Sequence, residues 1–353
     1  MTNATRPVIG ITMGDPASIG PEIALKALSK RQPFHDHCQP VVIGDARVLE
    51  RARSLLALGE IQIVPVTDLA QLNVHPGQVG VLDLHNADPD AFALGEVSEI
   101  AGRAAAEYVV RGTELALEGQ IAAIVTAPIN KEAINLGGYH FPGHTELLAH
   151  LTGAEDVSMM LTSSKLRVLH VSTHVSLEEA IRRVQTERVL KVIQLADRAC
   201  KMLGILQPRV AVAGLNPHAS EGGLFGHQEQ DEITPAINAA KEQGINASGP
   251  HPGDTVFLQT VQGRYDVVIA MYHDQGHIPM KLIGFDEGVN VSIGLPIIRT
   301  SVDHGTAFDI AGQGIADETS LICAVDVALQ MVKARAAKPL AETYPTDGVC
   351  WDG

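Results

Sequence analysis

The stretch Val8-Ile-Gly-Ile-Thr-Met-Gly14-Asp-Pro-Ala-Ser-Ile-Gly20-Pro-Glu-Ile23 determines the fold class. Its apolar start predicts a strand over Val8–Thr12, the glycine and proline that follow predict a turn, and Pro21 suits the first turn of a helix. A helix that starts directly after a strand presents free N–H groups to an anion. The stretch matches neither GxGxxG nor GxxxxGK[ST], so it is not a Rossmann or P-loop phosphate site. An alternative to an anion site is a simple tight turn in which Asp15 acts as a local cap.

The same alternation of strand and helix continues along the chain and is typical of a layered α/β fold. Continuous apolar runs indicate strands buried on both faces of a largely parallel sheet. We predict strands at Val8–Thr12, Val41–Ile43, Ile61–Val66, Ala122–Thr126, Ser158–Thr162, Arg167–His170, Arg209–Ala213, Val267–Met271 and Val289–Ile293. We predict helices at Pro21–Leu28, Ala46–Ala57, Val97–Glu118, His144–Leu151, Glu187–Leu203, Glu229–Glu242 and Glu318–Ala336.

The length of 353 residues predicts about two domains. No flexible linker separates them, so we expect two interwoven lobes, with a crossing near Thr126–Pro128 and a return near Met271–Pro296. The first lobe would hold residues 1–127 plus 295–353, and the second would hold residues 128–294.

Composition narrows the function classes. The net charge of −15 argues against a nucleic-acid surface and against an anionic membrane. The four cysteines stand far apart, without the spacing of a disulfide framework or a thiolate zinc site. The sequence has no signal-peptide pattern and no apolar run long enough for a transmembrane helix, so we expect a cytoplasmic protein.

Three histidines each follow a predicted strand: His174, His218 and His273. Ligands bind at the carboxyl ends of strands in open α/β sheets. Three imidazoles at three such ends could bind one divalent metal and leave positions open for substrate oxygens. The alternative is that each is an ordinary hydrogen-bonded loop residue. Spacing alone also does not exclude four further histidines as metal ligands: His170, His227, His277 and His304.

Anion-binding residues recur in the same part of the chain. Pro142-Gly-His-Thr145-Glu leads from a glycine into a predicted helix, so Thr145 and the first N–H groups could hold an oxyanion. Lys281, Asn290 and Arg299 lie in apolar segments with glycine and proline. A lysine and a forked arginine together suit a phosphate or carboxylate. In an acidic protein, such an anion needs locally placed cations.

Two further segments allow more than one interpretation. Asp254 follows Gly249-Pro-His-Pro-Gly, and it is either a helix N-cap or a carboxylate beside the metal. The segment Ser301-Val-Asp303-His-Gly-Thr306 could bind a nucleotide diphosphate or merely cap a helix. We set a Ser/His/Asp triad aside because the chain has no Gly-x-Ser-x-Gly elbow.

Together these segments resemble the 4-hydroxythreonine-4-phosphate dehydrogenase family. The matching motifs follow one another in family order over most of the chain, which makes the set specific. They are ITMGDPASIGPEI (11–23), TAPINK (126–131), PGHTE (142–146), STH (172–174), GLNPH (214–218), MYHDQG (271–276), GVN (288–290) and IRTSVDHGT (298–306). Ser18 departs from the family, which commonly has glycine there, and this puts the predicted turn geometry in doubt if that position needs a positive φ.

The resemblance implies an NAD-dependent enzyme with one divalent metal ion (Zn, Mg, Co or Mn). It also implies a layered α/β/α two-lobed fold similar to isocitrate and isopropylmalate dehydrogenases, with the active site in the cleft between the lobes. The second lobe would carry the metal and the interface of a homodimer with a shared site, in which the partner chain supplies His273. The implied residues are His174, His218 and His273 for the metal; His144, Thr145, Lys281, Asn290 and Arg299 for the substrate; Lys281 and Asp254 for catalysis; and Gly14, Asp15, Ser301 and Asp303 for the cofactor.

The segment Gly276-His-Ile-Pro-Met-Lys281 is most similar to that of the family branch that acts on 4-phospho-D-threonate or 4-phospho-D-erythronate. The implied reaction oxidises the C3 hydroxyl and then decarboxylates the 3-oxo acid. Two other branches remain, the enzyme of pyridoxal-phosphate biosynthesis and an aromatic cis-dihydrodiol carboxylate dehydrogenase. From the residues alone, a metal-dependent hydrolase or aldolase and a phosphometabolite-binding protein also stay open.

Overall fold

The computed structural model describes residues 6–155 and 157–337. Its centre is one twelve-stranded sheet with the order β3-β4-β2-β1-β5-β12-β11-β6-β7-β10-β8-β9. The strands are β1 (Val8–Thr12), β2 (Gln39–Gly44), β3 (Gln62–Val66), β4 (Gln78–Asp83), β5 (Ala123–Thr126), β6 (Ser158–Thr162), β7 (Arg167–His170), β8 (Val210–Ala213), β9 (Ala247–His251), β10 (Val267–Ala270), β11 (Val289–Ile293) and β12 (Arg299–Val302).

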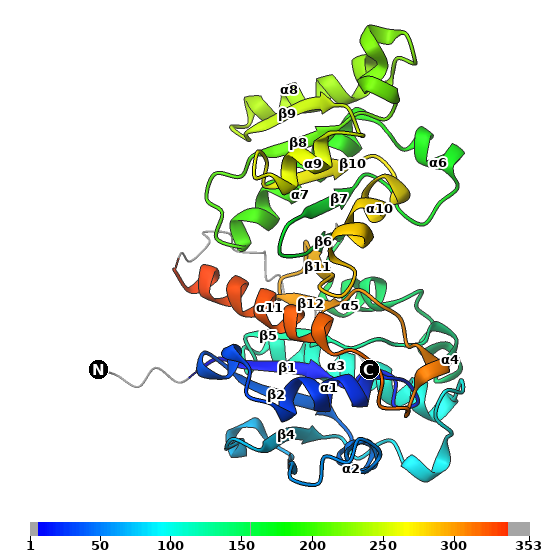
Figure 1. Cartoon of the computed structure of the whole chain (residues 1–353), viewed down its shortest axis with the longest axis vertical. Helices are drawn as coiled ribbons and strands as arrows, with labels where there is room; N and C mark the ends of the chain where they lie inside the picture. The colour runs from blue at the N-terminus through cyan, green and yellow to red at the C-terminus, as the bar shows by residue number, and fades with distance from the viewer. Residues whose placement is uncertain (1–5, 156, 338–353) are drawn as a thin grey trace.

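Helices pack around both the lower and the upper part of this sheet (Figure 1). They are α1 (Gly20–Ser29), α2 (Ala46–Leu55), α3 (Glu99–Leu117), α4 (Lys131–Leu136), α5 (His144–Thr152), α6 (Leu177–Arg182), α7 (Thr186–Met202), α8 (Thr234–Glu242), α9 (Val256–Val261), α10 (His273–Gly284) and α11 (Thr319–Ala337). The α/β class predicted from the sequence is confirmed. No helix among the described residues has the length and apolar character needed to cross a bilayer.

The direction of the strands changes in the middle of the sheet. From β3 to β12 all neighbours are parallel, and from β7 to β9 they are parallel again. Between these halves, β11 is antiparallel to both of its neighbours, and β6 is antiparallel to β7. The first half forms the lower part of Figure 1 and the second half the upper part, with β11 and β6 between them. The lobe boundaries at 127/128 and 294/295 stay a prediction, and residues 338–353 of the first lobe lie outside the described part.

The first turn, after β1, packs closely against the segment that follows β5. Gly14 has a φ of +74°, and a Cβ there would lie 2.5 Å from the carbonyl oxygen of Pro128. The backbone N–H of Asp15 donates to the same oxygen. Ser18 has no positive φ, and its hydroxyl donates to the Asp15 carbonyl and accepts from the Gly20 N–H. The turn therefore needs glycine at 14 but not at 18, which removes the difficulty raised by the sequence.

Several elements were not expected from the sequence: β4, β9 and β12 among the strands, and α4, α6, α9 and α10 among the helices. Arg299 is the first residue of β12, a strand in the middle of the sheet. Thr255, and not Asp254, occupies the N-cap of α9, so the N-cap interpretation of Asp254 is wrong.

Candidate active site

A cleft of about 980 Å³ lies at the middle of the sheet, where strands of opposite direction meet. Its wall comes from the end of β5, the start of α5, the end of β7, and strands β11 and β12. Six predicted site residues line it: His144, Thr145, His174, Asn290, Arg299 and Ser301. Seven do not: Gly14, Asp15, His218, Asp254, His273, Lys281 and Asp303.

Arg299 is a buried cation in the wall of this cleft. It is 3% exposed, and its guanidinium donates to Oγ1 of Thr126 at 2.6 Å and to Oγ of Ser292 at 3.0 Å. Among the described residues, its Nε has no hydrogen-bond partner, and the partners of its other nitrogens are hydroxyl oxygens rather than carboxylates. Burial lowers its pKa well below the ordinary value of an arginine, to about 9. A buried guanidinium without a counter-charge favours the binding of an anion.

His144 and Thr145 lie at the start of α5, on the same wall. No side chain caps this helix, so its first N–H groups stay available, as an oxyanion requires. Burial, and then the nearby guanidinium of Arg299, holds the pKa of His144 well below its ordinary value. The Nε2 atom of this neutral ring has no hydrogen-bond partner within the described ranges. These groups and Arg299 form an anion-binding end of the cleft.

Lys281, Asn290 and Asp303 form a polar group beside this end. The Nζ of Lys281 lies 2.7 Å from the carboxylate of Asp303 and 2.9 Å from its carbonyl oxygen. Asn290 donates to the other carboxylate oxygen at 3.2 Å. Asp303 therefore neutralises Lys281 here, although the sequence placed the lysine with the substrate and the aspartate with the cofactor. Both assignments remain predictions.

His174 and His273 lie side by side, with ring centroids 5.6 Å apart. They meet because β7 and β10 are adjacent parallel strands whose carboxyl ends share one edge. One chain already places His273 beside His174, so this pair does not require a partner chain, and the contribution of a partner chain to the metal site stays a prediction. His170 and His277, which spacing could not separate from the candidate ligands, adjoin the pair.

His218 is the predicted ligand that the structure does not bring to this pair. It lies after β8 in a segment where five successive residues, His218–Gly222, have positive φ values. Its exposed ring contacts Phe225, and its Nδ1 lies 2.9 Å from a carboxylate oxygen of Glu221. Two of the three predicted metal ligands therefore come together in one chain, and the third faces outward.

Asp15 and Asp254 lie outside the cleft. Asp15 is buried in the first turn, where burial raises its pKa from 3.8 to about 6 despite hydrogen bonds from the backbone. Its Oδ1 accepts from the N–H of Ala17 at 2.8 Å, a capping role that the sequence had left open. Asp254 is exposed and lines no part of the cleft. The structure gives no support to Asp254 as a catalytic residue.

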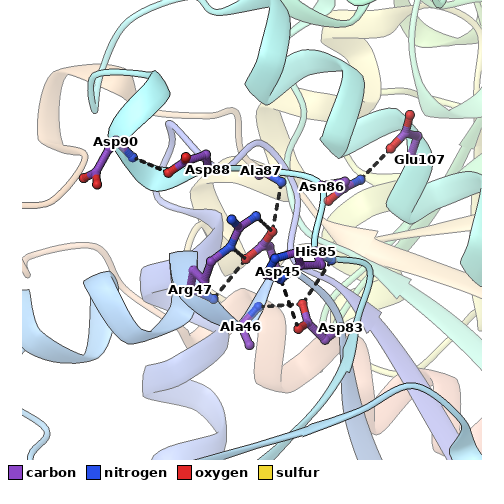
Figure 2. Close-up of polar contacts among 10 residues, drawn as sticks. All are labelled: Asp45, Ala46, Arg47, Asp83, His85, Asn86, Ala87, Asp88, Asp90 and Glu107. Carbon is purple, nitrogen blue, oxygen red and sulfur yellow. Dashed lines mark hydrogen bonds and ion pairs between the residues drawn. The ribbon is translucent and has the colours of Figure 1, made fainter.

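A second group of metal-ligand side chains lies at the ends of β2 and β4. Asp45, Asp83 and His85 are the three residues in the described chain whose ligand atoms lie within 4.8 Å of one another. Figure 2 shows the guanidinium of Arg47 turned onto Asp45, whose two oxygens accept four hydrogen bonds. Asp83 accepts from the backbone N–H groups of Ala46 and His85. These bonds give the carboxylates a structural role in holding the two strand ends.

The buried guanidinium, the free helix start and the histidine pair form a candidate site for a small anionic molecule. Residues 36–328 match the family described as pyridoxal phosphate biosynthetic protein PdxA, and the chain belongs to this family. It is 49% identical over 323 residues to the D-threonate 4-phosphate dehydrogenase of Salmonella typhimurium, covering 92% of this chain and 98% of that protein. The resemblance seen in the sequence motifs is thus confirmed.

Two further relatives support the same class. The 4-hydroxythreonine-4-phosphate dehydrogenase of Beijerinckia indica is 48% identical over 323 residues, which are 92% of this chain and 94% of that protein. The crystal structure of a 4-hydroxythreonine-4-phosphate dehydrogenase from Klebsiella pneumoniae is similar with a TM-score of 0.85 and 46% identity, covering 94% of this chain and 99% of that one. The predicted class of oxidoreductase, a dehydrogenase, is confirmed.

Proposed function

We propose that this dehydrogenase oxidises the C3 hydroxyl of a 4-phosphorylated four-carbon acid of the 4-phospho-D-threonate type, with NAD as the hydride acceptor. Decarboxylation of the resulting 3-oxo acid follows. The observation that carries the proposal is the buried guanidinium of Arg299, which has only hydroxyl partners and faces the cleft. The relatives named for D-threonate 4-phosphate and for 4-hydroxythreonine-4-phosphate support a phosphorylated substrate.

In this proposal the phosphate occupies the anion-binding end of the cleft. Arg299 donates to two of its oxygens, the first N–H groups of α5 donate to others, and Thr145 adds its hydroxyl. The neutral ring of His144 can donate through Nε2, which is otherwise unpaired. The phosphate takes no part in the chemistry, and its binding energy orients C3 in the cleft.

The histidine pair His174 and His273 fits a divalent metal, because two imidazoles at one sheet edge are the donors that Zn²⁺, Co²⁺ or Mn²⁺ accept. A bound metal ion would lower the pKa of the C3 hydroxyl and stabilise negative charge on the oxidised product. Lys281, held by Asp303 next to Asn290, is the group we expect to move a proton near the reacting carbons. We propose Gly14, Asp15, Ser301 and Asp303 only as the neighbourhood of the cofactor.

We propose that His218 completes the metal site of a partner chain in a homodimer. Its ring is exposed, and Leu224 and Phe225 beside it expose 72% and 46% of their surface. On α10, Ile278 and Leu282 expose 57% and 81%. Exposed apolar side chains beside a site that lacks one ligand favour a symmetric contact.

Subunit mixing tests the shared site. Mixing inactive His174→Ala chains with inactive His218→Ala chains gives about half mixed dimers, each with one intact site, so about a quarter of wild-type activity should return. The matched control mixes His174→Ala with His273→Ala, which remove ligands supplied by the same chain, and should stay inactive. Recovery in the control but not in the first mixture would contradict this arrangement.

The substrate is tested by following NADH absorbance with 4-phospho-D-threonate, 4-phospho-D-erythronate and 4-hydroxythreonine-4-phosphate. We expect the highest kcat/KM with a phosphorylated hydroxy acid. A preference for 4-hydroxythreonine-4-phosphate would assign the enzyme to pyridoxal-phosphate biosynthesis. Oxidation of an aromatic cis-dihydrodiol carboxylate, turnover without NADH, or binding without turnover would each refute the proposal.

A further inference from the structure

His170 is a buried histidine that the proposed reaction leaves without a role. It is the last residue of β7, its side chain is 3% exposed, and it borders the cleft. In the part of the chain that the structure describes, neither ring nitrogen makes a hydrogen bond of ordinary distance and angle, although the ring interacts with the backbone of His273. Buried polar groups are usually paired, so an unpaired imidazole at an active site indicates a function or a packing requirement.

The first turn of α10 rests directly on this ring. A Cβ added at Gly276 would lie 2.2 Å from Nε2 of His170 and 2.7 Å from Cγ1 of Val168. No side chain fits into that space, so the helix approaches β7 as closely as its backbone allows. The size and shape of the ring at 170 therefore set the distance between the helix and the strand.

Two further imidazoles connect this contact to the candidate metal ligands. The ring centroids of His170 and His277 are 4.7 Å apart, and those of His277 and His273 are 3.6 Å apart, with the latter planes inclined by only 9°. The Nδ1 of His277 also lies 3.1 Å from the carbonyl oxygen of His273. A displacement at His170 thus reaches His273 through one stacked ring and through the backbone of the same helical turn.

We propose that His170 is a positioning residue: its ring, in contact with Gly276 and His277, fixes the first turn of α10 and so the placement of His273. This inference rests on the proposed function, in which His273 and His174 bind the metal. A metal ion accepts its ligands only within narrow limits of distance and angle. Residues that orient metal ligands change metal affinity by about 10–100-fold when they are replaced.

The test measures metal affinity of the full-length chain rather than activity. Metal-free wild-type protein and variants are titrated with Co²⁺, and binding is followed by the visible spectrum and by calorimetry. We expect His170→Leu to bind Co²⁺ about 10–100-fold more weakly while its circular dichroism stays unchanged. Gly276→Ala, which introduces the Cβ against the ring, should weaken binding similarly. His150→Leu, which replaces an exposed histidine on α5, is the matched control and should bind as wild type does.

His170→Phe separates positioning from direct ligation, because phenylalanine keeps a planar ring but cannot bind a metal. We expect it to bind Co²⁺ more tightly than His170→Leu. If His170→Phe lost binding as completely as His174→Ala, then His170 would be a ligand and the positioning role would be wrong. If His170→Leu and Gly276→Ala both bound as wild type does, the inference would fail while the proposed function stood. Failure of the wild-type protein to bind Co²⁺ would overturn both.

Discussion

Replacing Arg299 with methionine separates the structural and the functional roles of the buried guanidinium. Without ligand, two effects on stability oppose each other. Burial lowers the pKa of Arg299 to about 9, which corresponds to about 5 kcal/mol of unfavourable burial of its charge, and methionine removes this cost. The hydrogen bonds to Thr126 and Ser292, about 1.5–3 kcal/mol each, are lost. The free energy of unfolding should therefore stay within about 2 kcal/mol of wild type.

Substrate binding should respond very differently. A guanidinium that holds a phosphate in bidentate fashion makes two charge-assisted hydrogen bonds, so their loss removes about 3–6 kcal/mol. This corresponds to a fall of about 10²–10⁴-fold in kcat/KM for the phosphorylated substrate. Arg299→Lys keeps the charge but not the fork, so its kcat/KM should lie between those of wild type and Arg299→Met. The KM for NAD should change much less in both variants.

Urea unfolding of the ligand-free protein and steady-state NADH assays give the two quantities. Arg103→Met is the matched control, because Arg103 is an exposed guanidinium on α3 paired with Glu99, and it should change neither. An unchanged kcat/KM in Arg299→Met would show that the anion binds elsewhere. A loss of more than about 4 kcal/mol in the ligand-free protein would show that Arg299 is mainly structural.

Three further predictions concern pH, the first turn and the metal. Because burial holds the pKa of His144 well below 6.5, this ring takes up a proton only on unfolding. The free energy of unfolding should therefore decrease as the pH falls below 6.5, by up to about 1.4 kcal/mol per pH unit from this group. Urea titrations at several pH values should show a flatter pH dependence for His144→Asn. Gly14→Ala should lower the free energy of unfolding by more than about 2 kcal/mol, since its Cβ meets a backbone oxygen at a position with positive φ. Gly59→Ala is the control, because a Cβ there has no atom within 4 Å, and it should leave the free energy of unfolding nearly unchanged. Urea unfolding measures both variants. His218→Ala should lose its stoichiometric metal with an unchanged circular dichroism spectrum, whereas His35→Ala should keep the metal.

The fold was predictable where local pattern and tertiary environment agree. Continuous apolar runs such as Val267–Met271 became buried strands, and most amphipathic segments became helices with ends within about two residues of the expected ones. The exception is α8, which begins at Thr234 rather than at Glu229, because residues Glu229–Ile233 form a turn of π-helix. β12 was missed because Arg299-Thr-Ser-Val302 is polar in sequence, and it is a strand only because β5 and β11 pair with it on both sides. α10 was missed because Gly276 and Pro279 both oppose a helix.

The sequence allowed a prediction of which residue types form the candidate site and that they lie at the carboxyl ends of the strands. The cleft brings together Arg299, His144 and Asn290, as expected for residues that suit an anion. The pairing of Lys281 with Asp303 was not predictable, because it joins residues from two elements whose relative placement only the tertiary structure fixes. The outward direction of His218 depends on a run of positive φ values that its sequence, mostly without glycine, gave no reason to expect.

The buried position of Arg299 also bears on how an acidic protein can select an anion. A chain with a net charge of −15 repels an anionic substrate at long range, and solvent-exposed cations lose most of their attraction beyond a Debye length of about 8 Å at physiological salt. Arg182 and Arg183 at the cleft rim are moreover paired with Glu178 and Glu179. Lys131 and Arg188 also line the cleft but are exposed to solvent. We therefore expect discrimination to depend most on a cation that is neither screened by solvent nor neutralised by a carboxylate. Arg299 meets both conditions, and its two hydroxyl partners hold its planar group in place before any ligand arrives.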